Sequence, residues 1–593
     1  MMTNISDKLI ALRAEMAKHD IHAWIIPSSD AHESEYVADY WLGREWLSGF
    51  TGSAGTLIVT SHDAALWTDG RYFIQAEQQL ANTGITFMKE GLPGVPSQSQ
   101  WLLGVVPENG FVGFDGNSMS LMKARSMERL LNKKEIQLKT DQDILNSIWN
   151  NRPALPANPV FLHSDDFAGK IREDKLSEVR AVMAEKEADQ LLITTLDDIA
   201  WLFNLRGSDI ECNPVFLAYA LITSEEATLF INDQRIELDA LDALKRSGIT
   251  IKPYEAIFPH LEGLTKIALQ IDPATTSQKL FNALPKDVEC IESASPSRAL
   301  KAIKNNTEIT RMADCHRRDG VAMVRFIRWL EDNISTGRLD EVNIDEKLVG
   351  FRADAKEYKG VSFPAIVGYA DHGAICHYRA DNESKYDIKT EGLLLIDSGG
   401  QYLDGTTDIT RTFACGNMTE EQKRDYTLVM KCHIAMATAC FRKGTRGIQL
   451  DAITRQPLWA EGLDYNHGTG HGVGYFLNVH EGPQSVSPRW FDVALEPGML
   501  ITNEPGMYRD GKHGVRLENI MLVVKDTANE FGEFYKLKPL TLTPFDTRPL
   551  IKEMLTPNEQ QWINDYHVLV RRELSPLLNG DDLHWLDKAT MSL

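Results

Sequence analysis

The stretch GLLLIDSGGQYLDGTTDITRTF, residues 392–413, places carboxylates in runs that otherwise have the character of buried β-strands. Asp397 ends the apolar run LLLI, and Asp408 lies within TTDITRTF. Two later β-rich runs share this feature, since Glu504 follows LIT and an asparagine and Glu518 lies in VRLENIMLVV. A buried strand normally excludes carboxylates because desolvating an unpaired charge is costly. Any one of these acids could be a satisfied structural residue, but four of them around a Gly/His loop predict a shared cation.

The expected donor set indicates which cation would bind. Four carboxylates and one imidazole are mostly hard oxygen donors, which suit Mn²⁺ and similar ions better than a thiolate zinc site does. Four negative charges also exceed what one divalent ion balances, so two metals bridged by carboxylates are the more economical prediction. Paired metals about 3.5–4 Å apart generate hydroxide at neutral pH and polarise carbonyl groups.

The register of the same stretch sets a geometric condition. A simple hairpin turning at Asp404–Gly405 would place Gln401, and not Asp397, opposite Asp408. Asp397 and Gln401 share a face but lie about 13 Å apart at 3.3 Å per residue. The two acids can therefore meet only where the ladder is interrupted, and Gly399–Gly400 is the expected bulge.

Length and composition bound the class of protein. A chain of 593 residues predicts two to four domains. Its 62 basic and 84 acidic residues give a net charge of −22, which repels phosphate backbones and anionic lipid, so neither nucleic acid nor membrane is an expected partner. The N-terminus lacks the apolar region of a signal peptide, and the seven cysteines form no CxxC, so a cytoplasmic location is expected.

The N-terminal half contains an internal repeat. DKLIALRAEMAKHDIHAWII (7–26) aligns without gaps on DKLSEVRAVMAEKEADQLLI (174–193), with eight of twenty positions identical. LSGFTGS and WTDGR later echo LFNLRGS and INDQR in the same order. The pattern predicts two copies of one α/β module, each with an amphipathic helix before an apolar strand, although charged helices also resemble one another by chance. A proline-rich linker at 150–160 then suggests domains at 1–152, 153–302 and 303–593.

Several motifs together carry a family resemblance. GAICHYRADNES, DSGGQYLDGTTDITRTF, HGTGHGVG, VHEGP, NEPGMY and GVRLEN occur in the order seen in the Xaa-Pro peptidases of the pita-bread metallopeptidase group, which also includes prolidase and methionine aminopeptidase. The chain resembles most the long three-domain cytosolic form of aminopeptidase P, and the likeness covers almost its whole length. The resemblance implies an α/β and α+β multidomain protein, in which two related N-terminal α/β modules precede a C-terminal pita-bread catalytic domain with an extension.

The resemblance also implies a set of site residues. Carried over position by position, the five metal ligands are Asp397, Asp408, His471, Glu504 and Glu518, and none is substituted. It implies two divalent metal ions, manganese before zinc or cobalt. It further implies removal of an N-terminal residue that precedes proline, and a homodimer. Catalytic or substrate-contacting roles fall on His377, His467 and His480.

A hypothesis for the mechanism gives each of these side chains a role. A metal-bridging hydroxide would attack the Xaa–Pro carbonyl carbon, with Glu504 as proton acceptor. His377 and His480 would stabilise the oxyanion and help to protonate the leaving proline nitrogen. Arg516 is expected to orient the ligands from behind, with a surface ion pair as the alternative.

Other residues are weaker candidates. Glu35 and Arg71 lie in N-terminal motifs that resemble the family's. Each could contact a substrate bound in a neighbouring subunit, or could have an ordinary surface or fold-stabilising role. His372 and His513 are expected to be solvated turn histidines.

The stretch NHGTGHGVGYFLNVHEG (466–482) contains two histidines, His467 and His471, at the spacing by which a helix presents two ligands. Its alternating glycines disfavour a helix, so an extended or looped backbone is expected. On such a backbone the two Cα atoms lie roughly 13 Å apart, too far for one ion. We therefore expect His471 to hold metal and His467 to contact substrate, and the glycines to let a peptide approach closely.

Three further functions share these ligands or this fold. A prolidase would cut only Xaa-Pro dipeptides, and a methionine aminopeptidase would need only the catalytic domain. Pita-bread folds also serve as non-catalytic binding modules. A protein with such a role would be expected to lack some of the metal ligands, whereas all five are present here.

Overall fold

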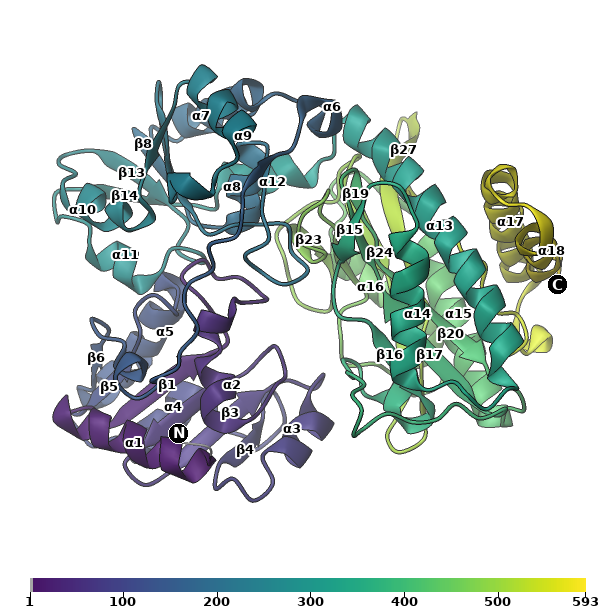
Figure 1. Cartoon of the computed structure of the whole chain (residues 1–593), viewed down its shortest axis with the longest axis horizontal. Coiled ribbons are helices and arrows are strands. Elements are labelled where there is room, and N and C mark those ends of the chain that lie inside the picture. Colours follow the sequence, from purple (N-terminus) through teal and green to yellow (C-terminus); the bar gives the residue numbers. More distant parts are fainter. Residues whose placement is uncertain (1–3) are drawn as a thin grey trace. The chain divides into compact units, whose positions relative to one another are not determined.

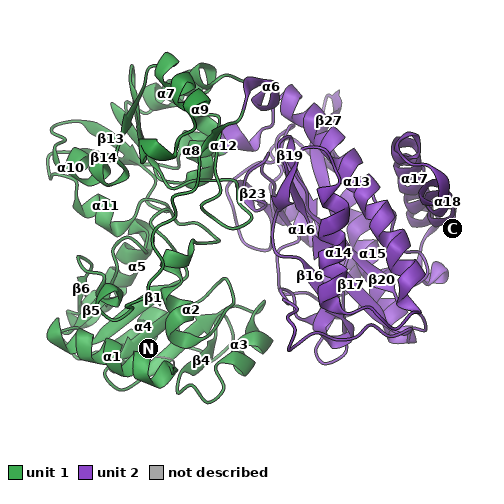
Figure 2. Cartoon of the chain, in the orientation of Figure 1, with its two compact units in different colours: residues 1–163, 170–298 green, residues 164–169, 299–593 purple. Residues whose placement is uncertain are grey.

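The computed structural model describes residues 4–593 (Figure 1). The chain divides into two compact units, residues 1–163 with 170–298 and residues 164–169 with 299–593 (Figure 2). None of the described helices combines the length and the apolar character that crossing a membrane needs.

The first unit contains two six-stranded sheets with the same strand order and the same strand directions. In each sheet the central strand pairs antiparallel with one neighbour and parallel with the other. The spatial order is β4 (Thr86–Lys89), β3 (Ala64–Thr68), β2 (Thr56–Thr60), β1 (Ala23–Pro27), β5 (Phe111–Phe114), β6 (Gln137–Lys139) in one sheet. In the other it is β12 (Ile249–Lys252), β11 (Ala227–Phe230), β10 (Tyr219–Thr223), β8 (Gln190–Ile193), β13 (Ala268–Ile271), β14 (Glu289–Glu292). The agreement confirms the predicted pair of related α/β modules.

In each module the predicted helix leads directly to the central strand of the sheet. α1 (Ile5–Lys18) leads to β1, and α7 (Arg172–Glu185) leads to β8. Successive side chains of β1 point to opposite faces of the sheet. Trp24 and Ile26 pack with α1, whereas Ala23 and Ile25 pack with α4 (Gln98–Val105) and α5 (Leu121–Leu131). Because both faces are covered, the strand is apolar throughout and does not alternate.

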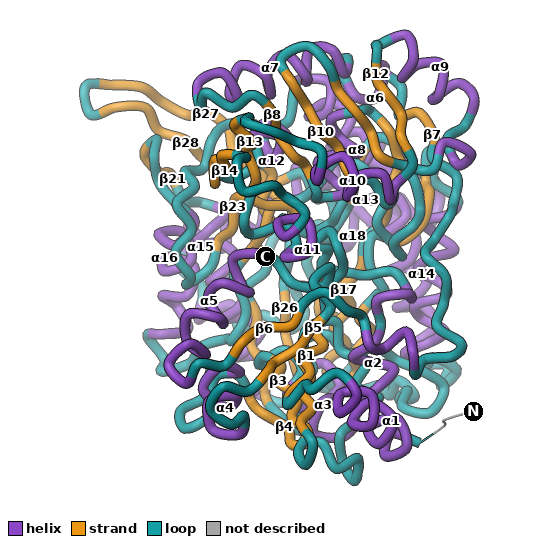
Figure 3. The backbone as a smooth tube through the Cα atoms, turned by 90° about the vertical axis from the view of Figure 1, so that its left-hand side faces the viewer, coloured by secondary structure: helices purple, strands orange, loops and turns teal. Residues whose placement is uncertain are grey.

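The second unit contains two groups of strands, each covered by a pair of helices. α13 (Asn306–Ile334) and α14 (Glu341–Ala353) pack on the sheet of β16 (Ile366–Tyr369), β17 (Leu393–Ser398) and β20 (Ile409–Ala414). α15 (Glu420–Ala437) and α16 (Gly447–Trp459) pack on the sheet of β21 (Cys440–Arg442), β28 (Gly532–Pro539), β27 (Asn519–Asn529) and β24 (Leu500–Asn503). Figure 3 shows the long hairpin that β27 and β28 form. This is the α+β architecture expected of the third domain.

Small strands and the C-terminal helices complete this unit. The small strands are β15 (Tyr358–Val361), β18 (Gly400–Tyr402), β19 (Gly405–Thr406), β22 (Gly470–Gly472), β23 (Glu481–Val486), β25 (Gly506–Arg509) and β26 (His513–Arg516). The helices α17 (Pro557–Leu574) and α18 (Gly580–Ala589) pack against α15 in one hydrophobic cluster.

The hairpin of residues 393–414 has a gap between its two paired segments, and its register differs from the prediction. The expected bulge at Gly399–Gly400 is wrong, because the same register continues on both sides of the gap. Asp397 pairs with Thr410 on the β17–β20 side, and Gln401 pairs with Thr406 on the β18–β19 side. The turn therefore lies at Leu403–Asp404, two positions from the predicted pairing, and the ladder breaks at Gly399, between β17 and β18.

Replacing Gly399 by alanine should destabilise the protein. A Cβ at this position would lie 2.0 Å from the Thr407 carbonyl oxygen and 2.1 Å from Ser362 Oγ. Overpacking of this kind costs about 1–3 kcal/mol, which a lower urea midpoint would report. Gly350 is the matched control, because no atom lies within 4 Å of its added Cβ. Gly350→Ala should leave the midpoint equal or higher, and equal midpoints for both variants would contradict the prediction.

Candidate metal centre

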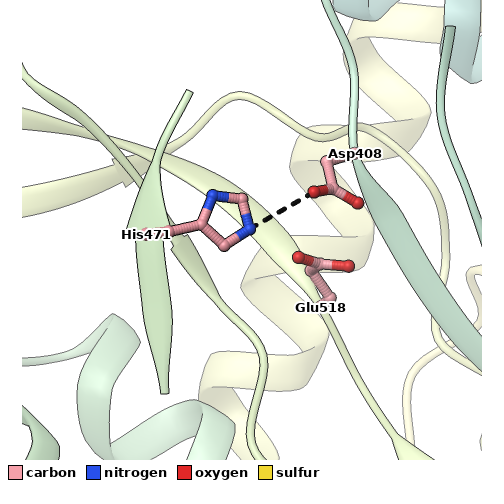
Figure 4. A group of neighbouring side chains, drawn as sticks. All are labelled: Asp408, His471 and Glu518. Atoms are coloured by element: carbon pink, nitrogen blue, oxygen red, sulfur yellow. Dashed lines mark ion pairs between the residues drawn. The ribbon is translucent and has the colours of Figure 1, made fainter. Parts of the chain in front are cut away.

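Three predicted ligands meet at the centre of the second unit. Asp408 lies just before β20, His471 lies on β22, and Glu518 lies between β26 and β27. One potential ligand atom from each lies within 4.8 Å of the others, and Figure 4 shows the three side chains facing a common point. His471 Nε2 is 3.5 Å from Asp408 Oδ2, so these two donors lie close together.

The other two predicted ligands border this group. Glu504 follows β24, and its Oε1 lies 3.7 Å from His471 Nε2. Asp397 lies near the end of β17, opposite Thr410, whose hydroxyl donates a hydrogen bond of 2.8 Å to Glu518. Asp397 Oδ1 is buried and has no hydrogen-bond partner, which is unusual for a carboxylate oxygen. An unsatisfied, buried oxygen at this position fits a cation ligand.

The electrostatics of the cluster point the same way. Burial and the neighbouring carboxylates together raise the pKa of Glu518 well above its usual range and the pKa of Glu504 to about 7. Burial lowers the pKa of His471, but hydrogen bonding to Asp408 and the charge of Glu504 outweigh it and raise the value to about 9. Carboxylates that repel one another in a buried site favour divalent cations. The donor set therefore fits the predicted metal ions.

Arg516 lies behind the ligands, where it is only 3 % exposed. Its Nη2 donates a hydrogen bond of 2.6 Å to Asp397 Oδ2, and its Nε donates one of 3.2 Å to Thr410 Oγ1. The alternative, an ion pair at the surface, is excluded by this burial.

Tyr508 belongs to the same network and was not singled out from the sequence. Arg516 Nη1 donates to the Tyr508 hydroxyl at 2.7 Å, and that hydroxyl lies 2.8 Å from His467 Nε2. In the β25–β26 hairpin Gly506 faces Arg516, so Tyr508, two residues on, shares the face of Arg516. The NEPGMY motif with this register could have indicated it.

A second arginine, Arg411, supports the ligands from the other direction. It is 1 % exposed, and its Nη1 donates a hydrogen bond of 2.6 Å to the Glu518 carbonyl oxygen. It also donates to the carbonyl oxygens of Thr543 and Pro544 and to the Tyr566 hydroxyl. The backbone beside Glu518 is thus tied to the C-terminal region of the chain.

The three predicted catalytic histidines lie at different places around the ligands. The His480 ring stands edge-on to the His471 ring, with centroids 4.3 Å apart. His467 contacts Tyr508, as described above. His377 is half-buried in the loop after the short helix η6 (Ala370–Ala374), and the carbonyl oxygen of its neighbour Cys376 accepts a hydrogen bond from Arg516 at 3.4 Å.

Two expectations about histidines are wrong. His513 is 2 % exposed, and its Nε2 lies 3.0 Å from Asp425 Oδ2. The His372 side chain is 12 % exposed and contacts the buried carboxylate of Glu341. Both have acidic partners far away in the sequence, so a glycine-flanked position did not make them solvated.

The glycines of 466–482 have a different use from the one expected. The stretch contains no helix, and β22 is extended, as predicted. However, a Cβ on Gly470 would lie 2.0 Å from the Thr502 carbonyl oxygen, and one on Gly472 would lie 2.1 Å from that of Glu481. These glycines let neighbouring protein backbone approach, so the approach of a substrate is not what requires them.

Glu35 and Arg71 lie in the first unit. Both line a cavity of about 730 Å³, and Arg71 donates two hydrogen bonds, of 2.8 and 2.7 Å, to Asp69. Their reach toward a substrate stays a prediction.

Comparison with protein families covers nearly the whole chain. Residues 8–145 and 151–308 each match the Creatinase/Prolidase N-terminal domain. Residues 310–525 match metallopeptidase family M24, and residues 533–593 match the C-terminal region of that peptidase.

Individual proteins give the same result. "Probable Xaa-Pro aminopeptidase P" of Laccaria bicolor is 41 % identical over 98 % of this chain and 93 % of its own length. The structure of X-prolyl aminopeptidase from Caenorhabditis elegans, described as a cytosolic enzyme with a di-nuclear active site, is 32 % identical. It covers 100 % of both chains with a TM-score of 0.96. The prolidase of Pyrococcus horikoshii is 25 % identical with a TM-score of 0.50, and it covers 63 % of this chain and 99 % of its own.

The fold, with its buried carboxylates and histidine between two helix-covered sheets, defines a metallopeptidase of the pita-bread class. The predicted fold class is confirmed by the family matches and by the full-length structural likeness. Within that class, the chain belongs to the Xaa-Pro aminopeptidase P group of metallopeptidase family M24.

Proposed function

We propose that this chain is a metal-dependent aminopeptidase that removes the N-terminal residue from peptides with proline in second position. The observation that carries the proposal is the group of Asp408, His471 and Glu518, bordered by Glu504 and by Asp397 with its unsatisfied oxygen, in a chain of this family. The full-length likeness to aminopeptidases P supports the substrate class.

The predicted ligands would hold two divalent cations, namely Asp397, Asp408, His471, Glu504 and Glu518. Manganese is the expected ion, with zinc and cobalt as alternatives, because the donors are mostly hard oxygens. When bound, such ions supply a nucleophile at neutral pH and polarise the substrate carbonyl.

The chain's own side chains would perform the proton transfers. The Glu504 carboxylate accepts a proton at the nucleophile. His377 and His480 stabilise the oxyanion and deliver a proton to the leaving proline nitrogen. That nitrogen is a tertiary amide without an N–H, so proline must be recognised by its ring shape and not by a donated hydrogen bond. Arg516 fixes Asp397 and, through Tyr508, the ring of His467.

Substrate length distinguishes this function from the main alternative. An aminopeptidase P should cleave Xaa-Pro-Yaa peptides after manganese loading, whereas a prolidase should cleave only Xaa-Pro dipeptides. The assay is turnover of a matched dipeptide and tripeptide pair, with metal content measured on the same sample. Exclusive cleavage of the dipeptide would favour prolidase, and no cleavage with no bound metal would favour a binding protein.

Replacing His467 by alanine should separate substrate contact from metal binding. Turnover of an Xaa-Pro-Yaa peptide should fall about 10²-fold, in the range of a lost proton-transfer group. Metal content should stay at the wild-type level, because the His467 ring hydrogen bonds to Tyr508 and is not grouped with the ligands. His62→Ala, at an exposed position, is the control. Loss of a full metal equivalent would show that His467 is itself a ligand.

The organisation of the protein is also proposed. We retain a division into domains at 1–152, 153–302 and 303–593, a homodimer and a cytoplasmic location. Limited proteolysis should cut first within 150–160, and sedimentation should give twice the chain mass of 66.7 kDa.

A further inference from the structure

The loop that carries His377 has almost no regular structure of its own. It runs from the short helix η6 (Ala370–Ala374) to Tyr386, and no strand or longer helix lies between them. A catalytic group on such a segment needs to be held by contacts from elsewhere. We propose that Glu341, the first residue of α14, is the positioning residue that holds this loop and thereby places His377. The inference rests on the proposed function.

Glu341 is fully buried, and both of its carboxylate oxygens are used. Oε1 accepts a hydrogen bond of 2.8 Å from the Tyr369 backbone N–H and lies 2.9 Å from His372 Nδ1. Oε2 accepts hydrogen bonds of 2.9 Å from the Tyr378 hydroxyl and 2.8 Å from the Tyr386 backbone N–H. One carboxylate therefore collects donors from before, within and after the loop.

Ring stacking reinforces the same three points. The His372 ring stacks on Tyr378 at a centroid distance of 4.2 Å and on Tyr386 at 3.6 Å. Tyr378 directly follows His377 in the sequence. With the rings and the carboxylate in place, the backbone on each side of His377 is fixed within a few residues.

The opposite side of the loop is fixed against the metal centre. A Cβ on Gly514 would lie 1.7 Å from the Gly373 carbonyl oxygen, so the two backbones are in direct contact. Gly514 lies on β26, two residues before Arg516, which binds Asp397 and the carbonyl oxygen of Cys376. The loop is thus held between Glu341 on one side and the strand of Arg516 on the other.

The helix itself does not need Glu341 to stay in place. Ile344 and Leu348 of α14 are 0 % and 1 % exposed and pack in the hydrophobic cluster with α13 and β17. Glu341 therefore acts on the loop, and through it on His377, more than on the position of α14.

The test is a double-mutant cycle with Glu341→Gln and His377→Ala. Glutamine keeps the shape but replaces one acceptor oxygen by an NH2 group, so a donor then faces two of the four donors from which Glu341 accepts. In the wild-type background, kcat for an Xaa-Pro-Yaa peptide should fall about tenfold or more, with KM within about threefold and metal content unchanged. In the His377→Ala background, the same replacement should change kcat less than about twofold, because the group that it places is absent.

Two further variants complete the design. Tyr378→Phe removes the hydrogen bond to Glu341, together with the longer contacts of that hydroxyl with Ser384, and keeps the aromatic ring. It therefore tests the proposal even where Glu341→Gln folds poorly, and its effect on kcat should also vanish without His377. Glu346→Gln, an exposed position on the same helix, should change kcat in neither background.

The outcomes separate the two hypotheses. The positioning role would be overturned if Glu341→Gln lowered kcat by the same factor with and without His377. It would also be overturned if Glu341→Gln left kcat unchanged and only lowered the melting temperature. Failure of the wild-type protein itself to cleave Xaa-Pro-Yaa peptides would overturn the proposed function instead.

Discussion

Replacing Glu504 by glutamine is expected to abolish turnover of Xaa-Pro peptides, with a fall in kcat of about 10³-fold. Glutamine has nearly the same shape as glutamate, but it is neutral and cannot accept the proton. Glu504 Oε1 lies 3.7 Å from His471 Nε2, among the predicted ligands, so the substitution removes both a metal donor and the proposed proton acceptor. The measurement is kcat with manganese-loaded protein, together with metal content.

The control is Glu421→Gln, an exposed residue of α15 that pairs with Lys512. It should retain wild-type kcat. Near-normal turnover by Glu504→Gln would show that another group accepts the proton.

After chelation of the metals, the same substitution should stabilise the protein, although it abolishes activity. Burial and the nearby carboxylates raise the Glu504 pKa to about 7 from an ordinary value of 4.5. The folded protein then binds this proton more tightly than the unfolded chain does, so the stability gained is full below pH 4.5 and lost as the pH rises through 7. Glutamine does not ionise, so the variant does not lose this stability as the pH rises. Above pH 7 the chelated variant should therefore melt at a higher temperature than the chelated wild type, and a lower one would contradict this account.

Replacing Asp408 by asparagine is expected to remove metal and activity together. Asp408 offers an oxygen within 4.8 Å of donor atoms of both His471 and Glu518, so it belongs to the closely grouped ligands. An amide oxygen is a weaker ligand for a hard divalent ion than a carboxylate is. We expect the purified variant to hold fewer than two metal equivalents, and turnover to fall about 10²-fold or more at equal manganese.

A buried aspartate in the same hairpin provides the matched control. Asp404 is 3 % exposed and pairs with Arg318, away from the predicted ligands. Asp404→Asn should lower the melting temperature, because it leaves Arg318 without its partner, but it should keep two metal equivalents. Two equivalents in Asp408→Asn, or equal metal loss in both variants, would show that the cluster is not assembled around Asp408.

Periodicity and residue type predicted the features that depend on local sequence. The aligned helix–strand stretches of the repeat became α1–β1 and α7–β8, in sheets of identical order. Of the acids on apolar runs, Asp397 lies within β17, whereas Asp408, Glu504 and Glu518 lie directly next to strands and not within them. Their grouping could be predicted because an unpaired buried charge is rare enough to be informative.

The register of the 393–414 hairpin could not be predicted from local signals. Asp404–Gly405 has the chemistry of a tight turn, yet Gly405 lies on β19 opposite Tyr402. A Cβ on Gly405 would lie 2.7 Å from Met312 Sδ of α13, so this glycine serves helix packing and the turn moves to the preceding residues. The partners of His372 and His513 were missed for the same reason, since each lies on another element.

The contacts of Arg411 bear on how the protein is made. All five predicted ligands are translated once residue 518 is complete, yet Arg411, which holds the Glu518 carbonyl, also needs Thr543, Pro544 and Tyr566. A nascent chain that has left the ribosome only as far as Glu518 therefore carries every ligand on an unfinished scaffold. The centre acquires this support only when α17 has emerged, so the enzyme is expected to be inactive until then.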